Sequence, residues 1–377
     1  MSDPVWEDGG SLGLPPLVGD VRADVCVVGL GGSGLTAVAE LLARGAVVVG
    51  VDAGQVGGGA AGRNGGFLLA GLARGHHRMV EQLGRDRAKT LYRRTLEELD
   101  RIAAAAPDTL QRKGSLRIEL TEEGLADCAA QAAAMRADGF AVQEYDGPEG
   151  RGLLFPDDGT IQPLRRCRLL ARSLPGLHEH SPVTAIGTGL VTTAQGRVLC
   201  GAVVVAVDGR LELLLPELAG TVRTVRLQML ATAPTDEVAV PRPVYLRDGF
   251  EYWQQLPDGR IALGGFRDLG GAEEETASTA TSATVQDALE AFLRTHLRVT
   301  APVTHRWAAS VGYTQDALPF LGEVRQGVWA AGGYCGTGNV VGALCGRQLA
   351  ADALGERADY FGASRAAPSR RTTSPLA

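Results

Sequence analysis

Hydrophobic and polar residues follow different periods along the chain, and each period predicts a different kind of element. Short unbroken apolar runs at 25–28, 46–51 and 202–207 are typical of strands that are buried on both faces. Apolar residues spaced three and four apart predict a helix at 35–42 and a long helical stretch at 76–106. Further helices are expected at 121–138, 164–173, 281–297 and 339–354. The chain therefore begins as a β-α-β unit and continues into a helical block.

Between residues 221 and 268 the pattern changes to the two-residue alternation of half-buried strands. The dipeptides Asp248-Gly249 and Asp258-Gly259 are turn signals, so this region is predicted to be antiparallel sheet with hairpins. Shorter strands joined by turns are expected at 183–186, 190–193 and 198–199. The first β-α-β unit needs more parallel strands, and the candidates at 203–207 and 328–331 lie far away in the sequence.

This interrupted order predicts an α/β fold with two parts. A Rossmann-like nucleotide-binding domain is assembled from discontinuous segments, and an antiparallel-sheet substrate domain with helices is inserted between them. We expect an N-terminal arm at 1–21, the nucleotide-binding domain at 22–75, 150–210 and 300–360, the substrate domain at 76–149 and 211–299, and a disordered tail at 361–377. The tail is rich in Ser, Pro and Arg, which offer too little apolar surface to order a segment.

Composition narrows the class of protein. The 377 residues are 45% hydrophobic, which is enough for a large core, and the net charge of −6 argues against a nucleic-acid partner. No apolar stretch is long enough to span a membrane, and the N-terminus lacks the regions of a signal peptide, so we expect a cytoplasmic protein. Six scattered cysteines without a C-x-x-C pair predict reduced thiols, and isolated histidine pairs predict no metal site. No oligomeric state is predicted.

A glycine string lies where the first strand should turn into a helix. Gly29, Gly31 and Gly34 have the spacing G-x-G-x-x-G, which suits a tight turn, a close approach to pyrophosphate and close packing of helix on strand. Asp52 ends the next apolar run about 20 residues on, where a carboxylate can accept a hydrogen bond from a ribose hydroxyl. The neighbours Gly32, Ser33 and Ala53 complete this predicted set. Strand, glycines, helix, strand and acid in this order predict a dinucleotide site.

A second glycine-rich segment runs from Gly54 to Phe67. Such a segment is either a flexible loop or backbone that lies against a ligand. Arg63 and Asn64 in its midst favour the ligand, because they can hold pyrophosphate or ring edges while glycines bring N–H groups close. The predicted binding residues of this loop are Gly62, Arg63, Asn64, Gly65 and Gly66.

Three stretches together resemble one family. They are the arm and fingerprint from Trp6 to Gly34, the loop Ala61-Gly62-Arg63-Asn64-Gly65-Gly66, and the segment from Thr314 to Gly322 followed by 331–338. The chain resembles, over residues 5–357, the flavin-dependent amine and amino-acid oxidoreductases of the D-amino-acid oxidase and glycine oxidase superfamily. It looks closest to the branch that contains gamma-glutamylputrescine oxidoreductase. The resemblance implies FAD rather than NAD, bound between the nucleotide-binding domain and a sheet-based substrate domain.

The resemblance also implies cofactor contacts at two further places. The run Gly336-Thr337-Gly338 should open a helix at Asn339 whose N-terminus faces the flavin pyrimidine, although a plain helix cap is the alternative. Gly333 belongs to the same segment. Val183 matches the position where the family holds adenine through the backbone, and an ordinary sheet residue is the alternative there.

Departures from the family pattern refine the expected chemistry. Asp52 stands where the superfamily mostly has Glu, and either acid can bind ribose. Amino-acid oxidases of this type carry an arginine before the Thr-x-Asp motif, but Ala309–Tyr313 holds none, so an amine is favoured over a free α-amino acid. Neither that stretch nor the loop at 59–66 supplies the cysteine or histidine of covalent members, so FAD is expected without a covalent link. Cys335 and Thr337 replace the Ser and His that are common in the branch.

The expected reaction is oxidation of an amine C–N bond to an imine by hydride transfer to FAD, followed by hydrolysis to a carbonyl. Oxygen or another acceptor would then reoxidise the flavin. The alternatives are a D-amino-acid or glycine-type oxidase, a non-catalytic flavin-binding protein and a nicotinamide-dependent dehydrogenase. No nucleophile motif is needed, because the cofactor carries the redox chemistry and the protein binds and orients the substrate.

The candidate substrate wall lies on the predicted antiparallel sheet. Tyr252 and Trp253 are able to box an amine by cation–π contact, although strand alternation predicts that one of them faces the core. Arg267 or Arg247 would bind a distal carboxylate, with a surface salt bridge as the alternative for each. Tyr334, beside the C-terminal glycines, is the remaining candidate.

Overall fold

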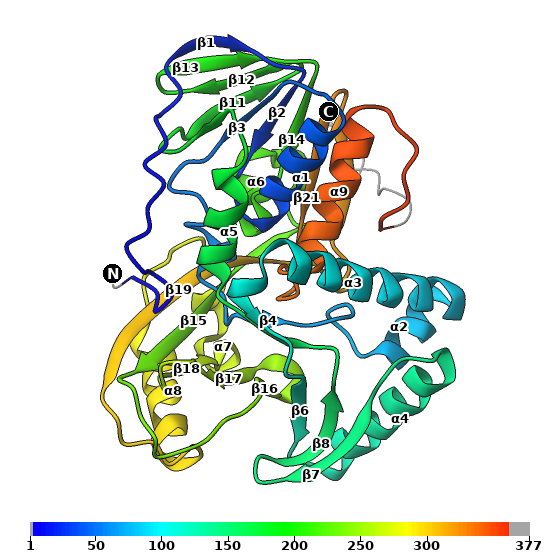
Figure 1. The fold of residues 1–377 in the computed structure, drawn as a ribbon, viewed down its shortest axis with the longest axis vertical. Coiled ribbons are helices and arrows are strands. Elements are labelled where there is room, and N and C mark those ends of the chain that lie inside the picture. The colour runs from blue at the N-terminus through cyan, green and yellow to red at the C-terminus, as the bar shows by residue number, and fades with distance from the viewer. Residues whose placement is uncertain (1–2, 362–377) are drawn as a thin grey trace, which may run out of the picture.

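The computed structural model describes residues 3–361 of the chain. Its upper half in Figure 1 is built on a six-stranded sheet with the order β10-β3-β2-β14-β21-β20. The strands are β2 (Val25–Val28), β3 (Val48–Val51), β10 (Leu177–His178), β14 (Ala202–Val205), β20 (Phe320–Arg325) and β21 (Val328–Gly332). All neighbours pair in parallel except β20 and β21. The expected recruitment of parallel strands from distant segments is confirmed.

Two helices pack side by side against this sheet (Figure 1). They are α1 (Gly32–Ala43) and α9 (Val341–Ala353), the first and last helices of the described chain. Their apolar sides join the strands in one buried core that also contains Phe361, the last described residue. The rest of the predicted tail, 362–377, lies outside the described residues. The carboxyl ends of β2 and β3 and the first turn of α1 line the cavity that is described below.

A four-stranded sheet packs on the other side of the parallel sheet, since side chains of both share one core cluster. Its order is β1 (Gly19–Arg22), β13 (Gly196–Leu199), β12 (Leu190–Thr193) and β11 (Val183–Gly187). The end of the predicted N-terminal arm is thus a strand, because β1 pairs in parallel with β13. The short helices α5 (Pro163–Arg172) and α6 (Leu211–Leu214) lie in this half as well.

The lower half in Figure 1 contains an eight-stranded sheet. Its order is β19 (Val303–Tyr313), β15 (Arg223–Thr232), β18 (Ile261–Gly265), β17 (Glu251–Gln255), β16 (Val244–Leu246), β6 (Ser115–Glu119), β8 (Gly150–Phe155) and β7 (Gln143–Gly147). Every neighbouring pair is antiparallel except β16 and β6. Helix α8 (Ala283–Thr295) packs on one face of this sheet. β8 and β19 pair here although they fall inside the ranges expected for the nucleotide-binding domain.

The long helical stretch predicted at 76–106 is two helices, α2 (His76–Leu83) and α3 (Arg85–Ala105). Gly84 separates them with a φ of +80°, which does not continue a right-handed helix. Helix α4 (Glu122–Asp138) begins after Thr121, whose side chain accepts from the Gly124 N–H, and ends at the left-handed Gly139. Residues of all three helices, among them His76, Tyr92 and Gln131, line the cavity that is described below.

The remaining elements are short. A three-stranded sheet has the order β4 (Phe67–Leu68), β9 (Gly159–Ile161) and β5 (Leu110–Gln111). The other short helices are α7 (Arg267–Gly270), η1 (Ala60–Gly62), η2 (Pro107–Thr109), η3 (Asp208–Arg210), η4 (Pro216–Leu218), η5 (Arg247–Gly249) and η6 (Gly271–Glu274). All six cysteines are free thiols. Within residues 3–361, no helix is long and apolar enough to cross a membrane and no side-chain cluster suits a metal ion.

Candidate active site

One cavity of about 1180 Å³ is shared by the two halves of the molecule. Its upper wall consists of loops at the carboxyl ends of the parallel strands, and its lower wall consists of side chains from the eight-stranded sheet. The predicted cofactor residues that line it are Gly29, Gly31, Gly32, Ser33, Asp52, Ala53, Gly62, Arg63, Asn64, Gly65, Val183, Gly336, Thr337, Gly338 and Asn339. Gly34, Gly66 and Gly333 are not part of the lining. The cavity is large enough for a dinucleotide and a small substrate together.

The dinucleotide loop is shaped by backbone packing at two of its glycines. A Cβ on Gly29 would lie 2.6 Å from the Ala206 carbonyl oxygen, and a Cβ on Gly34 would lie 1.8 Å from the Gly29 carbonyl oxygen. Gly31 differs, because a Cβ there would meet only the Ala61 Cβ, at 3.1 Å. The side of Gly31 that faces the cavity is therefore open to a ligand rather than filled by protein.

Helix α1 offers free donors to that ligand. Its N-cap is Gly31, no side chain caps it, and its first turn holds no acidic residue. The unpaired N–H groups and the helix dipole together favour an anion such as a pyrophosphate. Arg166 of α5 adds a buried cation nearby, since one of its guanidinium nitrogens would lie 3.1 Å from a Cβ on Gly32. Arg166 was not predicted from the sequence, because its neighbour Arg165 has the same chemistry and only packing shows which side chain faces inward.

Asp52 lies at the end of β3 beside the same loop. Its Oδ2 accepts from the Leu30 N–H at 2.7 Å, and its Oδ1 accepts from the Gly54 N–H at 2.9 Å. Burial raises the pKa of this carboxyl, and the two backbone hydrogen bonds oppose that rise. Each carboxylate oxygen keeps acceptor capacity for a ribose hydroxyl. The glycine cradle, the helix N-terminus and this acid all fit the nucleotide part of FAD.

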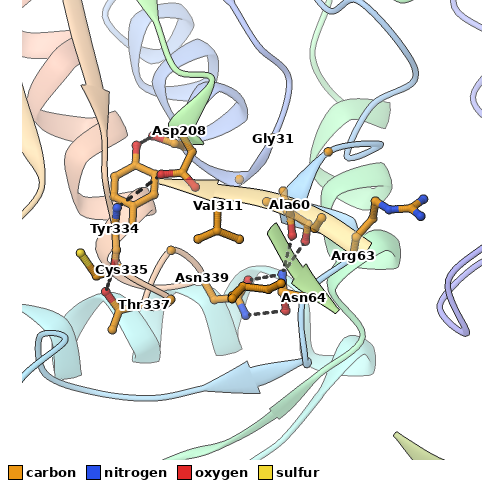
Figure 2. Close-up of a pocket in the computed structure, with 18 of the residues that line it drawn as sticks. Gly31, Ala60, Arg63, Asn64, Asp208, Val311, Tyr334, Cys335, Thr337 and Asn339 are labelled. Atoms are coloured by element: carbon orange, nitrogen blue, oxygen red, sulfur yellow. Dashed lines mark hydrogen bonds between the residues drawn. The ribbon is translucent and has the colours of Figure 1, made fainter. Parts of the chain in front are cut away.

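Asn64 and Asn339 join the two predicted flavin loops. The Asn64 Nδ2 donates to the Ala61 carbonyl at 2.8 Å, and its Oδ1 accepts from the Gly66 N–H at 2.8 Å. The Asn339 Nδ2 donates to the Asn64 Oδ1 at 3.1 Å and to the Phe67 carbonyl at 2.7 Å. Figure 2 shows the two carboxamides facing each other. These side chains hold the loops in place, and direct contact with flavin stays a prediction.

Arg63 connects the second loop to the eight-stranded sheet. Its Nε donates to the Ala308 carbonyl at 2.8 Å, and its own carbonyl accepts from the Trp307 Nε1 at 2.8 Å. Figure 2 shows its guanidinium directed away from Asn64. Its Nη2 is buried without a partner among residues 3–361, and burial lowers the pKa of the guanidinium. Binding of pyrophosphate or the flavin ring by Arg63 therefore stays a prediction.

Asp208 organises the C-terminal flavin segment and was missed by the sequence analysis. It comes shortly after β14 with a φ of +47° and is half-buried among backbone donors. Its Oδ1 accepts from the Gly333 N–H at 2.9 Å and from the Tyr334 N–H at 3.3 Å, and its Oδ2 accepts from the Gly312 N–H at 2.9 Å. Burial raises its pKa, and these bonds oppose the rise. An acid shortly after a buried parallel strand was the available signal.

Tyr334 and Thr337 are committed to contacts within the protein. The Tyr334 hydroxyl lies 2.8 Å from the Ser33 Oγ, which links the C-terminal segment to α1, and the ring is buried. The Thr337 Oγ1 donates to the Tyr334 carbonyl at 2.7 Å. Helix α9 begins at Val341 rather than at Asn339, so the predicted glycine run precedes the helix as a turn. Tyr334 still lines the cavity, but its ring is buried and its hydroxyl contacts Ser33.

Tyr252 and Trp253, the two aromatic candidates, point to opposite faces of the sheet from strand β17. Tyr252 faces the cavity, where its ring packs over Gly65 and meets the Phe67 ring edge-on at 5.8 Å. Burial raises the pKa of its phenol. Trp253 points to the opposite face of the sheet and packs on Phe292 at 5.6 Å between ring centroids. The prediction of Trp253 as a substrate-wall residue is therefore wrong, because adjacent strand residues face opposite sides.

Of the two arginine candidates, one lines the cavity and the other does not. Arg267, at the start of α7, lines the cavity. Arg247 does not line it and instead pairs with Glu251 and with Asp268. The salt-bridge alternative is thus confirmed for Arg247. Farther along the cavity, the buried Asp158 accepts from the Ser115 hydroxyl at 2.6 Å and from the Ala70 N–H at 2.8 Å. Burial raises the pKa of the Asp158 carboxyl to about 7.

Fold and site together define a dinucleotide-binding protein in which a second, mostly antiparallel sheet closes the cofactor cavity. Residues 24–352 match the DAO family, described as FAD dependent oxidoreductase. The chain belongs to this family. The match supports FAD over the nicotinamide alternative, and the sequence-based assignment to this superfamily is confirmed.

The relatives agree with that assignment. The chain is 26% identical to the probable oxidoreductase OrdL of Haemophilus influenzae, over 91% of this chain and 85% of that protein. It is 28% identical to gamma-glutamylputrescine oxidoreductase of Escherichia coli, over 90% and 86% of the two chains. The solved structure of glycine oxidase from Geobacillus kaustophilus matches with a TM-score of 0.72 at 20% identity, over 91% of this chain and 99% of that chain. This likeness confirms the predicted fold class.

Proposed function

We propose that this FAD-dependent oxidoreductase oxidises the C–N bond of an amine or an amino-acid derivative. The observation that carries the proposal is the shared cavity, which joins the dinucleotide cradle to a wall formed by Tyr252, Tyr313 and Arg267. FAD, when bound, supplies the acceptor for the hydride and leaves an imine that water hydrolyses to a carbonyl. The name of the gamma-glutamylputrescine oxidoreductase relative is consistent with such a substrate.

The chain's own residues would position the substrate and keep water away. Tyr252 and Phe67 form an edge-on aromatic pair beside the second loop, and Met229, Leu227 and Val311 add apolar lining. A dry wall favours the neutral form of an amine, which is the form that releases a hydride readily. Oriented binding then accounts for much of the rate, and no protein nucleophile is required.

An amine is favoured over a free α-amino acid by the residues before Thr314. Val311 lies between the second loop and the C-terminal segment in Figure 2, and its apolar side chain offers no partner to a carboxylate. Glycine-type oxidation remains the alternative, since glycine oxidase shares the fold. A non-catalytic flavin-binding role is the second alternative.

The test is reduction of the bound flavin. The purified protein should be yellow, and anaerobic addition of amines, polyamines and amino acids should bleach the flavin absorbance only with the true substrate class. Reduction by α-amino acids alone would favour the glycine-type alternative, and no reduction by any of these compounds would favour the non-catalytic one. Stopped-flow reoxidation with oxygen and with a dye would then identify the electron acceptor.

The binding mode of FAD has its own test. The stretch Ala309–Tyr313 and the loop at 59–66 hold no cysteine or histidine, so we propose non-covalent FAD. Acid precipitation should leave the yellow colour in the supernatant. Colour in the pellet would contradict this binding mode and would direct attention to Cys167 and Cys335, the cysteines that line the cavity among residues 3–361.

A further inference from the structure

Arg267 is held between two aromatic rings on the cavity wall. Its guanidinium carbon lies 4.5 Å from the ring centroid of Phe250 and 4.6 Å from that of Tyr313. All three residues line the cavity. Contact with the two rings restrains the guanidinium, whose planar set of N–H groups suits a carboxylate acceptor. The rings orient this cation without neutralising its charge.

Arg247 contacts the same Phe250 ring but has a structural role. Its guanidinium carbon lies 5.4 Å from the same Phe250 ring, but it pairs with Glu251 and, at 3.0 Å, with Asp268. It has no part in the cavity lining. Arg267 forms no ion pair with a carboxylate of residues 3–361. One cation is thus satisfied by the protein, and the other presents a charge to the cavity that the protein leaves for a ligand.

We propose that Arg267 binds a carboxylate carried by the substrate at the end remote from the oxidised amine, so that the substrate class is an ω-amino carboxylate. The proposal rests on the function proposed above. Guanidinium and carboxylate match each other as a planar, bidentate pair, which an amine alone does not offer. The positively charged wall would also disfavour a plain diamine, because like charges repel.

The position of the pocket supports the remote placement. Val311 and Tyr313 lie on the same face of β19, since they are two residues apart, and this separates them by about 7 Å along the strand. The apolar Val311 lies beside the two predicted flavin loops (Figure 2), whereas Arg267 stacks over Tyr313 farther along. A carboxylate on the reacting carbon would therefore meet Val311, and only one several bonds away would reach Arg267.

The test compares matched ligands on the flavin-loaded protein. Acetate, propionate, butyrate and valerate serve as amine-free probes, and binding is read as a change in the flavin spectrum and in the melting temperature. Valerate or butyrate should bind more tightly than acetate. The Arg267→Gln variant should raise the Kd of that probe by about tenfold or more, while Arg247→Gln should leave it unchanged. If no carboxylate of the series binds, or if Arg267→Gln binds it as tightly as the parent, the proposal is overturned.

The kinetics of amine oxidation provide a second and independent test of the proposal. δ-Aminovalerate and pentylamine differ only in the terminal carboxylate, and Arg267→Gln should raise KM for the first by a similar factor while leaving the second unchanged. An equal loss for both amines would indicate a merely structural role and would count against the proposal. Should Arg267→Gln fail to hold flavin, Arg267→Lys keeps the charge without the planar fork and should retain part of the affinity. Carboxylate binding that depends on Arg267 without any amine oxidation would refute the proposed function and leave the carboxylate site standing.

Discussion

The two walls of the cavity are built by different means. The nucleotide wall is mostly main chain, because Gly29 and Gly34 bring backbones together and Asp208 collects backbone N–H groups. The opposite wall is mostly side chain, because it contains the ring of Tyr252 from β17 and the guanidinium of Arg267 from α7. Backbone geometry needs particular residues at particular spacings, whereas a side-chain wall depends on which face of a strand looks inward. A substitution on the first wall is therefore expected to disturb main-chain geometry, and one on the second wall is expected to change the side chains that a ligand meets.

The largest effect is expected at the nucleotide wall. Gly31→Ala places a methyl group 3.1 Å from the Ala61 Cβ, a tight contact that a shift of a few tenths of an ångström relieves, so the chain should still fold. The methyl would collide with a bound pyrophosphate and weaken FAD binding by at least about a hundredfold. The measurement is the flavin-to-protein absorbance ratio after purification, followed by titration of the apoprotein with FAD.

Gly187→Ala is the matched control for that variant. Gly187 lies in β11, and a Cβ there would make ordinary contacts with Leu190 at 3.7 and 3.9 Å. It should keep a full complement of FAD, with the circular dichroism of the parent. A Gly31→Ala protein that is folded and fully yellow would show that the pyrophosphate lies elsewhere.

The side-chain wall is tested by two neighbours on β17. Trp253→Ala should lower the free energy of unfolding by about 3–5 kcal/mol, because it removes a buried ring from the core beneath α8. The preference among amines should not change, since Trp253 is absent from the cavity lining. Tyr252→Ala should instead change the KM values for amines. Denaturant unfolding and anaerobic flavin reduction measure the two effects, and Trp253→Phe provides a milder variant if Trp253→Ala does not fold.

The same contrast explains what the sequence could predict. The glycine spacing and Asp52 led to the dinucleotide loop, because they reflect local backbone requirements that a short motif contains. Alternation predicted that either Tyr252 or Trp253 faces the core, but the choice depends on α8, which packs on one face of the sheet. β19 was placed with the nucleotide-binding domain because nothing local reveals that it pairs with β15 along its whole length. Asp208 and Arg166 were missed because their partners come from distant segments.

A smaller effect is expected from the acid that holds the nucleotide wall together. Asp208→Asn keeps a residue that tolerates the positive φ, but it replaces a carboxyl group that accepts from three backbone N–H groups with an amide, whose NH₂ end cannot accept a hydrogen bond. The free energy of unfolding should fall by about 1–3 kcal/mol, and FAD should bind more weakly. Asp208→Ala should lower both further. Unfolding and FAD titration are measured on the same samples. An unchanged FAD affinity in both variants would mean that Gly312, Gly333 and Tyr334 do not shape the cofactor site.

The smallest effect is a pH dependence of stability that comes from Asp158, a residue of the cavity lining. Burial raises the folded-state pKa of Asp158 from 3.8 to about 7, so between these values the folded protein holds a proton that the unfolded chain has lost. The contribution of Asp158 to stability therefore falls as pH rises through this window and is constant above it. Relative to Asp158→Asn, the parent should lose about 1 kcal/mol of unfolding free energy between about pH 6 and about pH 8.

Parallel denaturant titrations of the two proteins at each pH measure that difference. Ser115→Ala sharpens the result, because the Ser115 hydroxyl donates to the Asp158 Oδ2 and lowers its pKa, so removing it should move the loss of stability to higher pH. A constant difference between parent and Asp158→Asn across the whole range would mean that the carboxyl is ionised in the folded protein throughout. The cavity lining would then carry a buried negative charge at Asp158.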